Sequence, residues 1–167
     1  GVTVVFLPGA YDGCLEPGAS GAADAPVVYR VDTPRSVILR GGTASDGAKT
    51  CLRLKDRDYV HLSGFLLRPP RGIGWVQFLN VTHSELRDCD MDDVRDARPV
   101  DCRNCHYNRY VNVRCTRANN IGVWGHVSGD LWNNWNSSHN IFERLTIMGV
   151  GHRPFGLWLD CSHNVIR

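Results

Sequence analysis

The sequence predicts a right-handed parallel β-helix, in which each coil of the chain contributes short strands to stacked parallel sheets. Three observations predict this all-β fold. Landmark residues recur in a fixed order about every two dozen residues, short apolar segments alternate with polar turns, and no stretch has the apolar spacing of an amphipathic helix. Links this short exclude a sheet with helical crossovers. The constant order of the landmarks argues against antiparallel hairpins, which also use short turns.

The repeat is clearest in the last third of the chain, where a Gly-His pair, a Leu-Trp pair and a Ser-His-Asn triplet occur twice. The first copy is Gly125-His126, Leu131-Trp132 and Ser138-His139-Asn140. The second copy is Gly151-His152, Leu157-Trp158 and Ser162-His163-Asn164. Neighbouring coils of a β-helix lie ~4.8 Å apart, so residues at equivalent positions form columns along the stack.

A column of polar turn residues extends the repeat towards the amino terminus. We expect it to contain Asn108, Asn140 and Asn164, each amide bonding to its neighbours above and below. Ser84 and Asp58 are expected to occupy the same position in the two coils before Asn108. Three unrelated turn asparagines are the alternative interpretation.

Short strands are expected on both sides of each turn. Those after the turns are 60–65, 86–91, 110–115, 142–147 and 165–166, and those before them are 51–54, 75–79, 100–102, 131–132 and 157–159. Strands at 2–7, 27–30 and 36–40 complete the first coils. We therefore expect one domain, residues 1–167, of about six coils, which looks cut from a longer protein at both ends.

Composition favours a globular chain, with 43% hydrophobic and 22% charged residues. The net charge of +2 gives no electrostatic reason to expect a nucleic acid or a membrane as partner, and we expect a monomer. No apolar run approaches the roughly 20 residues of a membrane span. Cys102 and Cys105 form a CxxC motif without a second one, so the seven cysteines are interpreted as small apolar core residues of open redox state rather than as a zinc site.

Five segments, in order, carry a resemblance to a known family. They are Leu7-Pro8-Gly9-Ala10-Tyr11, Ser20-Gly21, Val28-Tyr29-Arg30, Val37-Ile38-Leu39-Arg40-Gly41-Gly42 and Asp58-Tyr59-Val60-His61-Leu62-Ser63-Gly64-Phe65. Across about residues 3–92, this order resembles the amino-terminal coils of the pectin-lyase-like β-helix family that contains alginate lyases and chondroitinase B. The resemblance implies a bacterial, secreted or periplasmic protein that acts on polysaccharide. The family's catalytic Lys and Arg and its calcium-binding acids come from later motifs that this sequence lacks, so no catalytic residue is carried over.

Candidate catalytic residues come from the repeat itself. His126 and His152 occupy matching positions and are followed by Asp130 and Arg153. Two imidazoles one coil apart, with a carboxylate, suit a metal ion or a general base, and no definite metal site is predicted. A structural histidine column, bonded to loop backbone, is the alternative. His139 and His163, with His83 beside them, are expected to stack or to bond within the turns.

Candidate substrate-binding residues are Trp124, Trp135, Arg103 and Tyr107, because exposed aromatic faces and arginines hold acidic sugars. Trp132 and Trp158, as repeat partners, are expected in the core. The acidic segment 88–96 has the oxygen ligands that Ca²⁺ prefers, which makes calcium a candidate cofactor, although a solvated loop is the simpler interpretation.

Two functions follow from these observations. The first is a polysaccharide-active enzyme, a lyase that cleaves a uronate-containing polymer by β-elimination or else a glycoside hydrolase. The second is a non-catalytic β-helix module that binds carbohydrate or serves a structural role at a surface. Fold alone does not decide between them, because unrelated activities share this architecture.

Overall fold

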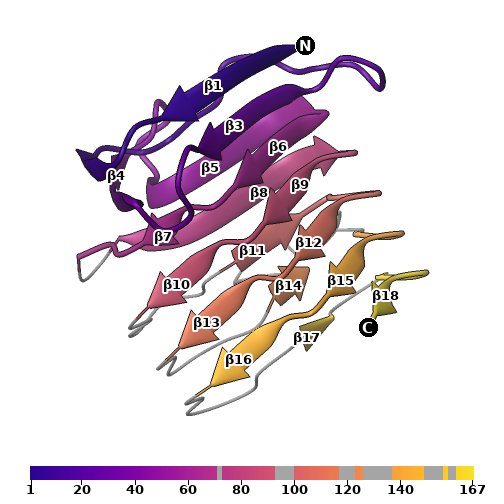
Figure 1. Ribbon diagram of the computed structural model, residues 1–167. Coiled ribbons are helices and arrows are strands. Elements are labelled where there is room, and N and C mark those ends of the chain that lie inside the picture. Colours follow the sequence, from indigo (N-terminus) through magenta and orange to yellow (C-terminus); the bar gives the residue numbers. More distant parts are fainter. Residues whose placement is uncertain (71–72, 93–99, 117–122, 126–136, 149–155, 158–160) are drawn as a thin grey trace.

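The computed structural model describes residues 1–70, 73–92, 100–116, 123–125, 137–148, 156–157 and 161–167, of which 123–125, 147 and 156–157 are described by their backbone alone. The chain winds into a β-solenoid of about five turns, against the six expected. Figure 1 shows the coils stacked from the amino-terminal strand at one end to β18 at the other. The expected right-handed parallel β-helix is confirmed.

Each coil contributes in turn to three faces of the solenoid. The first sheet contains β1 (Val2–Phe6), β3 (Val27–Val31), β6 (Val60–Ser63), β9 (Glu85–Arg87), β12 (Arg109–Val111), β15 (Ile141–Glu143) and β18 (Val165–Ile166). The second sheet contains β2 (Gly9–Asp12), β4 (Val37–Thr43), β7 (Leu66–Leu67), β10 (Asp90–Asp92), β13 (Arg114–Thr116) and β16 (Thr146–Met148). The third sheet contains β5 (Lys49–Asp58), β8 (Gly74–Thr82), β11 (Val100–Arg103), β14 (Val123–Gly125) and β17 (Gly156–Leu157). These strands pair in parallel within each sheet, and β4 meets β5 in an antiparallel pair that joins the second sheet to the third.

Three of the expected strands, 86–91, 110–115 and 142–147, are in fact two strands on different sheets. The segment 110–115, for example, contains the end of β12 and the start of β13, with Asn112 between them in the left-handed conformation at φ 52°. Gly64, Asp88 and Arg144 occupy the same corner in other coils, with φ values of 84°, 53° and 52°. Asn, Asp and Gly tolerate this conformation, so one such residue turns the chain from the first sheet to the second without a loop.

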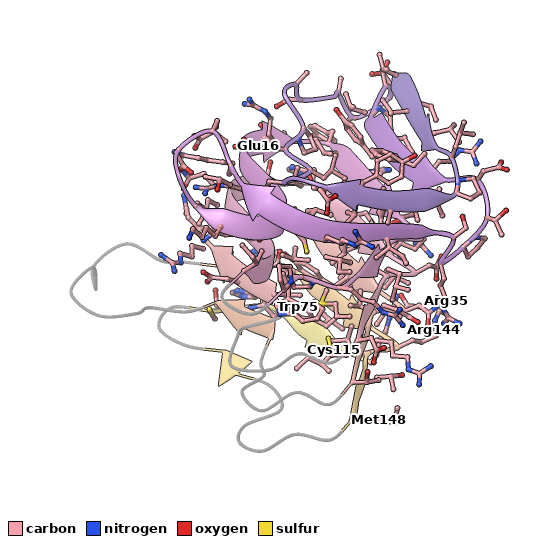
Figure 2. All side chains as sticks on the ribbon, turned by 90° about the vertical axis from the view of Figure 1, so that its left-hand side faces the viewer. Glu16, Arg35, Trp75, Cys115, Arg144 and Met148 are labelled. Atoms are coloured by element: carbon pink, nitrogen blue, oxygen red, sulfur yellow. The ribbon has the colours of Figure 1, made fainter. Side chains whose placement is uncertain are left out.

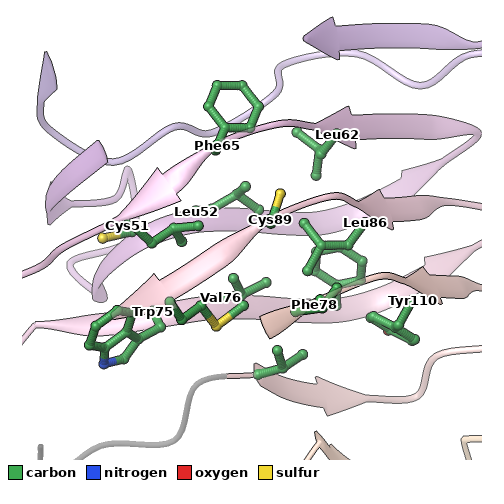
Figure 3. Close-up of a cluster of buried hydrophobic side chains, with 14 of the residues drawn as sticks. Cys51, Leu52, Leu62, Phe65, Trp75, Val76, Phe78, Leu86, Cys89 and Tyr110 are labelled. Atoms are coloured by element: carbon green, nitrogen blue, oxygen red, sulfur yellow. The ribbon is translucent and has the colours of Figure 1, made fainter. Parts of the chain in front are cut away.

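The core lies between the three sheets and consists of columns of apolar side chains (Figure 3). On the first sheet, Leu62, Leu86, Tyr110 and Phe142 follow one another in register, and the last two rings stack at 5.0 Å. Leu67, Met91 and Cys115 form the equivalent column of the second sheet. Cys102 and Cys105 are buried with them, as expected of core cysteines.

The predicted asparagine column is confirmed, with a bonding pattern different from the one expected. Each amide bonds to backbone: Asn108 Oδ1 accepts from the Ser84 N–H at 2.9 Å, and Asn140 Oδ1 accepts from the Asn108 N–H at 2.9 Å. Asn164 Oδ1 completes the series by accepting from the Asn140 N–H at 2.9 Å. Asn108 is fully buried, so these bonds satisfy backbone groups that water cannot reach.

The expected place of Asp58 in that column was wrong. Val60 precedes Ser84 in the column, because its N–H donates to Ser84 Oγ at 3.0 Å. Asp58 instead pairs with Thr82, whose hydroxyl donates to the Asp58 carboxylate at 2.5 Å. The 26-residue spacing counted from the sequence missed the register, which is 24 residues here as in the next coil.

Candidate functional site

Most of the predicted catalytic and binding residues lie outside the described residues. These are His126, Asp130, His152, Arg153 and Trp135. Trp124 lies on β14, of which only the backbone is described. Arg103 and Tyr107 are described in full, and the two occupy very different surroundings.

Arg103 ends β11 on the outer face of the third sheet. Its guanidinium is held by Asp101, two residues earlier on the same strand face, with Nε 3.2 Å from Oδ1 and Nη2 2.8 Å from Oδ2. A bidentate pair of this kind fixes the orientation of the arginine. About a fifth of the Arg103 side chain, 21%, stays exposed.

Tyr107 belongs to a continuous stack of rings along the turns that precede the first sheet. Tyr107 lies 5.1 Å from His83 and 4.7 Å from His139, measured between ring centroids. The stack continues to Tyr59 at one end and His163 at the other, both at 4.8 Å from the next ring. The stacking expected of the turn histidines is confirmed. Both faces of Tyr107 are covered, so only its ring edge remains for the substrate contact that the sequence predicts.

A cavity of about 250 Å³ opens on the third sheet, near Arg103. It is lined by Ala48, Lys49 and Thr50 of the β4–β5 hairpin, by Gly74, Trp75, Val76 and Gln77 of β8, and by Asp101 of β11. Trp75, labelled in Figure 2, is otherwise buried in the core and forms the apolar wall. Apolar walls with a few convergent polar groups are typical of ligand pockets.

The same face holds buried polar atoms that lack a protein partner. Among the described residues these are Arg53 Nε, Arg53 Nη1 and Gln77 Oε1. Arg53 and Gln77 are register partners across β5 and β8, and Gln77 is in turn the partner of Asp101. Buried polar groups are satisfied in folded proteins, so this row of side chains has the capacity to bind solvent or a polar ligand.

Electrostatics fix Arg53 in this place. Its side chain is only 4% exposed and its Nη2 is hydrogen-bonded to Asp46, which also accepts from Lys55 Nζ at 3.2 Å. Partial burial opposes ionisation of Asp46, but the hydrogen bond from Lys55 and the charge of Arg53 outweigh it and lower the pKa of this carboxyl. Asp46 therefore stays ionised and pairs with both cations, Arg53 and Lys55.

The sequence analysis missed Lys49, Arg53 and Gln77. One signal was present for Arg53, because it interrupts the otherwise apolar segment Cys51-Leu52-Arg53-Leu54, all four residues of which prove to be buried. A charged residue in such a run is buried only with partners, and that made it a candidate. Gln77 and Lys49 had no comparable signal, because their importance arises from register with β5 and β11.

Neither thiol chemistry nor a metal cluster is supported by the described residues. Burial raises the pKa of Cys51, Cys89 and Cys115 to about 12, so these thiols are protonated and poor nucleophiles at neutral pH. Within the described ranges, no group of three or more His, Cys, Asp or Glu side chains converges as a metal site would require. Of the acidic segment, Asp90 and Asp92 are ion-paired with Arg35 and Arg68.

Three solved structures share this architecture. An alginate lyase from Paenibacillus sp. str. FPU-7 superposes with a TM-score of 0.79 at 17% identity, covering 98% of this chain and 57% of the lyase. A rhamnogalacturonan lyase superposes with a TM-score of 0.70 at 14% identity, covering 98% of this chain and 48% of the lyase. A family 6 polysaccharide lyase from Pseudopedobacter saltans superposes with a TM-score of 0.51 at 13% identity, covering 90% of this chain and 47% of the lyase.

These likenesses show the fold, a parallel β-helix of the pectin-lyase-like type, as the resemblance of the opening coils implied. The chain spans about half the length of these structures. No protein-family model matches the sequence, and no curated protein matches it. In the described part of the chain, we find no helical segment with the length and hydrophobicity of a membrane span.

Proposed function

We propose that this chain is part of a polysaccharide-active β-helix protein that binds an extended, uronate-containing polysaccharide along the third sheet and cleaves it by β-elimination. The cavity on that sheet carries the proposal, because it is lined by Lys49 and by Gln77, whose buried Oε1 lacks a partner. Arg53 is the register partner of Gln77, and Arg103 is bonded to Asp101 of the cavity wall. The alginate and rhamnogalacturonan lyases that share the fold support polysaccharide as the substrate class. A secreted or periplasmic location follows from such a substrate.

The chemistry assigns a task to each kind of residue. β-Elimination needs positive charge at the uronate carboxylate, which acidifies the C5 proton, and Lys49 and Arg103 supply that charge. Gln77 and Asp101 offer hydrogen bonds to sugar hydroxyls, and we assign the apolar contact to Trp124, the register partner of Asp101. We assign the general base to His126, which directly follows β14 in the sequence, and place its repeat partner His152 with Asp130 and Arg153 in the same proposed catalytic group. Trp135 and Tyr107 are further contacts, and calcium is a candidate for neutralising the carboxylate.

The test is to incubate the protein with alginate, pectate and chondroitin and to follow the ultraviolet absorbance of unsaturated products, with and without calcium. We expect His126→Ala to lower kcat by about two orders of magnitude or more. We expect Gln77→Ala to raise KM chiefly. His61→Ala is the matched control, because His61 lies on the first sheet, away from the cavity. Absence of both unsaturated products and new reducing ends would rule out lyase and hydrolase activity on these polymers.

A non-catalytic binding module is the second candidate. The stacked rings and the asparagine column favour it, because the recurring His and Asn side chains there stabilise the turns. The cavity favours it too, because no described histidine lines its wall. Binding of the same polymers without any cleavage, lost in Gln77→Ala, would identify the module.

A further inference from the structure

A second concave site lies on the second sheet, away from the third-sheet cavity. It is a groove of about 220 Å³ lined by side chains of β7, β10 and β13 together with Arg35, which precedes β4. Figure 2 labels Arg35 and Met148 on this side of the molecule, with Met148 further along the stack. No residue is shared between the linings of the groove and the cavity.

Two parallel rows of outward side chains form the groove. In the first row, Leu66, Asp90 and Arg114 are register partners in three successive coils. In the second row, Asp92 pairs in register with Thr116, whose hydroxyl donates to Asp92 Oδ1 at 2.8 Å. The groove thus offers one apolar surface, Leu66, beside carboxylate, hydroxyl and guanidinium groups.

The charges in the groove are unequal. Arg35 Nε lies 2.8 Å from Asp90, and Arg68 Nη2 lies 3.1 Å from Asp92, so two arginines neutralise the two carboxylates. Arg114 lines the same groove, is exposed, and makes no ion pair with any residue that the structure describes. A single guanidinium therefore faces the groove with its donors available, and it is the group that binds a carboxylate bidentately.

We propose that this groove is a second carbohydrate-binding site, which binds one uronate unit of an acidic polysaccharide. Arg114 binds the sugar carboxylate, Leu66 packs against the C–H face of the ring, and Asp90 and Asp92 accept hydrogen bonds from its hydroxyls. We expect the site to bind without cleaving. The only carboxylates in its described lining, Asp90 and Asp92, are each ion-paired with an arginine. It is independent of catalysis on the third sheet and would hold a polymer to the protein by a second attachment.

The experiment measures binding of a short oligouronate to the full chain by isothermal titration calorimetry, with a neutral oligosaccharide of the same length as the comparison. We expect Arg114→Ala to weaken the oligouronate at one site by about tenfold or more, and Arg114→Lys to weaken it less, because lysine keeps the charge but not the bidentate geometry. Arg30→Ala is the matched control, an exposed arginine on the first sheet outside the groove.

Each result has one meaning. Equal affinities for Arg114→Ala and the unaltered protein would overturn the proposal, and so would an equal loss in Arg30→Ala, which would indicate unspecific attraction. Equal binding of the neutral oligosaccharide would overturn the assignment of a uronate. Acetate distinguishes recognition of the saccharide from recognition of any carboxylate. Displacement of the oligouronate by acetate at a comparable concentration would contradict a sugar site. Gln77→Ala is expected to weaken binding at the third-sheet cavity alone and to leave binding at the second-sheet groove unchanged. A failure of the groove proposal can therefore be told apart from a failure of the third-sheet function.

Discussion

At the scale of single residues, the buried amide of Asn108 bonds to backbone groups of a neighbouring coil. Asn108 accepts from one backbone N–H and donates through Nδ2 to the Val81 carbonyl at 2.8 Å, and it is fully buried. Removing its amide leaves the Ser84 N–H without a partner in a region closed to water, while the Val81 carbonyl keeps its bond from the His106 N–H at 3.0 Å. Unpartnered buried groups cost about 1–3 kcal/mol each.

We therefore expect Asn108→Ala to lower the free energy of unfolding by about 1–3 kcal/mol. Asn112→Gly is the control, because Asn112 is exposed, makes one side-chain bond to Asp88, and glycine keeps its left-handed backbone. Denaturant titration followed by circular dichroism measures both. A loss in Asn108→Ala no larger than that in Asn112→Gly would contradict a structural role for the column.

A second prediction at this scale concerns pH. Burial, with the nearby charge of His139, lowers the pKa of His106 below its usual 6.5. The unfolded chain then binds the proton more readily than the folded one, so the stability contributed by His106 is present above pH 6.5 and is lost as the pH falls through that value towards the folded-state pKa. Between pH 7 and pH 5, we expect the free energy of unfolding of the native protein to fall more steeply than that of His106→Asn. Identical slopes for the two proteins would refute this.

At the scale of the element, the corner between the first and second sheets depends on one left-handed residue per coil. Gly64 has φ 84°, and a Cβ built there would lie 2.4 Å from Val31 Cγ2. A substitution thus combines backbone strain with a steric clash inside the core. Gly47 has φ 87° in the β4–β5 hairpin, yet a Cβ there meets nothing within 4 Å.

The two glycines separate these costs. We expect Gly47→Ala to destabilise the protein by about 1 kcal/mol, the cost of the left-handed backbone alone. Gly64→Ala adds the clash with Val31 and should cost about 2–4 kcal/mol. Thermal unfolding of both variants gives the comparison. Equal effects would mean that Val31 moves aside freely.

At the scale of the whole molecule, the stack buries its cysteines along the length of the solenoid. Cys51, Cys89, Cys102, Cys105 and Cys115 are buried, whereas Cys14 and Cys161 are of intermediate exposure. Burial with the charge of Glu16 raises even the pKa of Cys14 to about 11. Cys14, Cys51, Cys89 and Cys115 therefore present little thiolate at neutral pH.

We expect iodoacetamide at pH 7.5 to leave the five buried cysteines unmodified until denaturant unfolds the coils around them. Mass spectrometry of peptides after timed labelling measures this. Rapid modification of Cys89 in the absence of denaturant would indicate that the stack opens locally.

The sequence alone determined that the chain is a parallel β-helix, because a period is a local property that can be counted. The recurring Ser-His-Asn triplets placed Asn140 and Asn164 in one column, the spacing upstream added Asn108, and the stack confirms all three. It also identified the turn histidines as stacking residues. It misjudged Asp58 and merged strands across Asn112, because spacing does not reveal which residue adopts the left-handed conformation.

Only the tertiary structure decided where polar side chains meet. Arg53, Gln77 and Asp101 come from three different coils and become neighbours through the register of β5, β8 and β11. Leu66, Asp90 and Arg114 meet in the same way on the second sheet. A binding surface on a β-helix is built across coils, one residue from each, so it has no contiguous motif in the chain. The repeat therefore allows the fold to be predicted from the sequence, whereas a site built from one residue per coil cannot be.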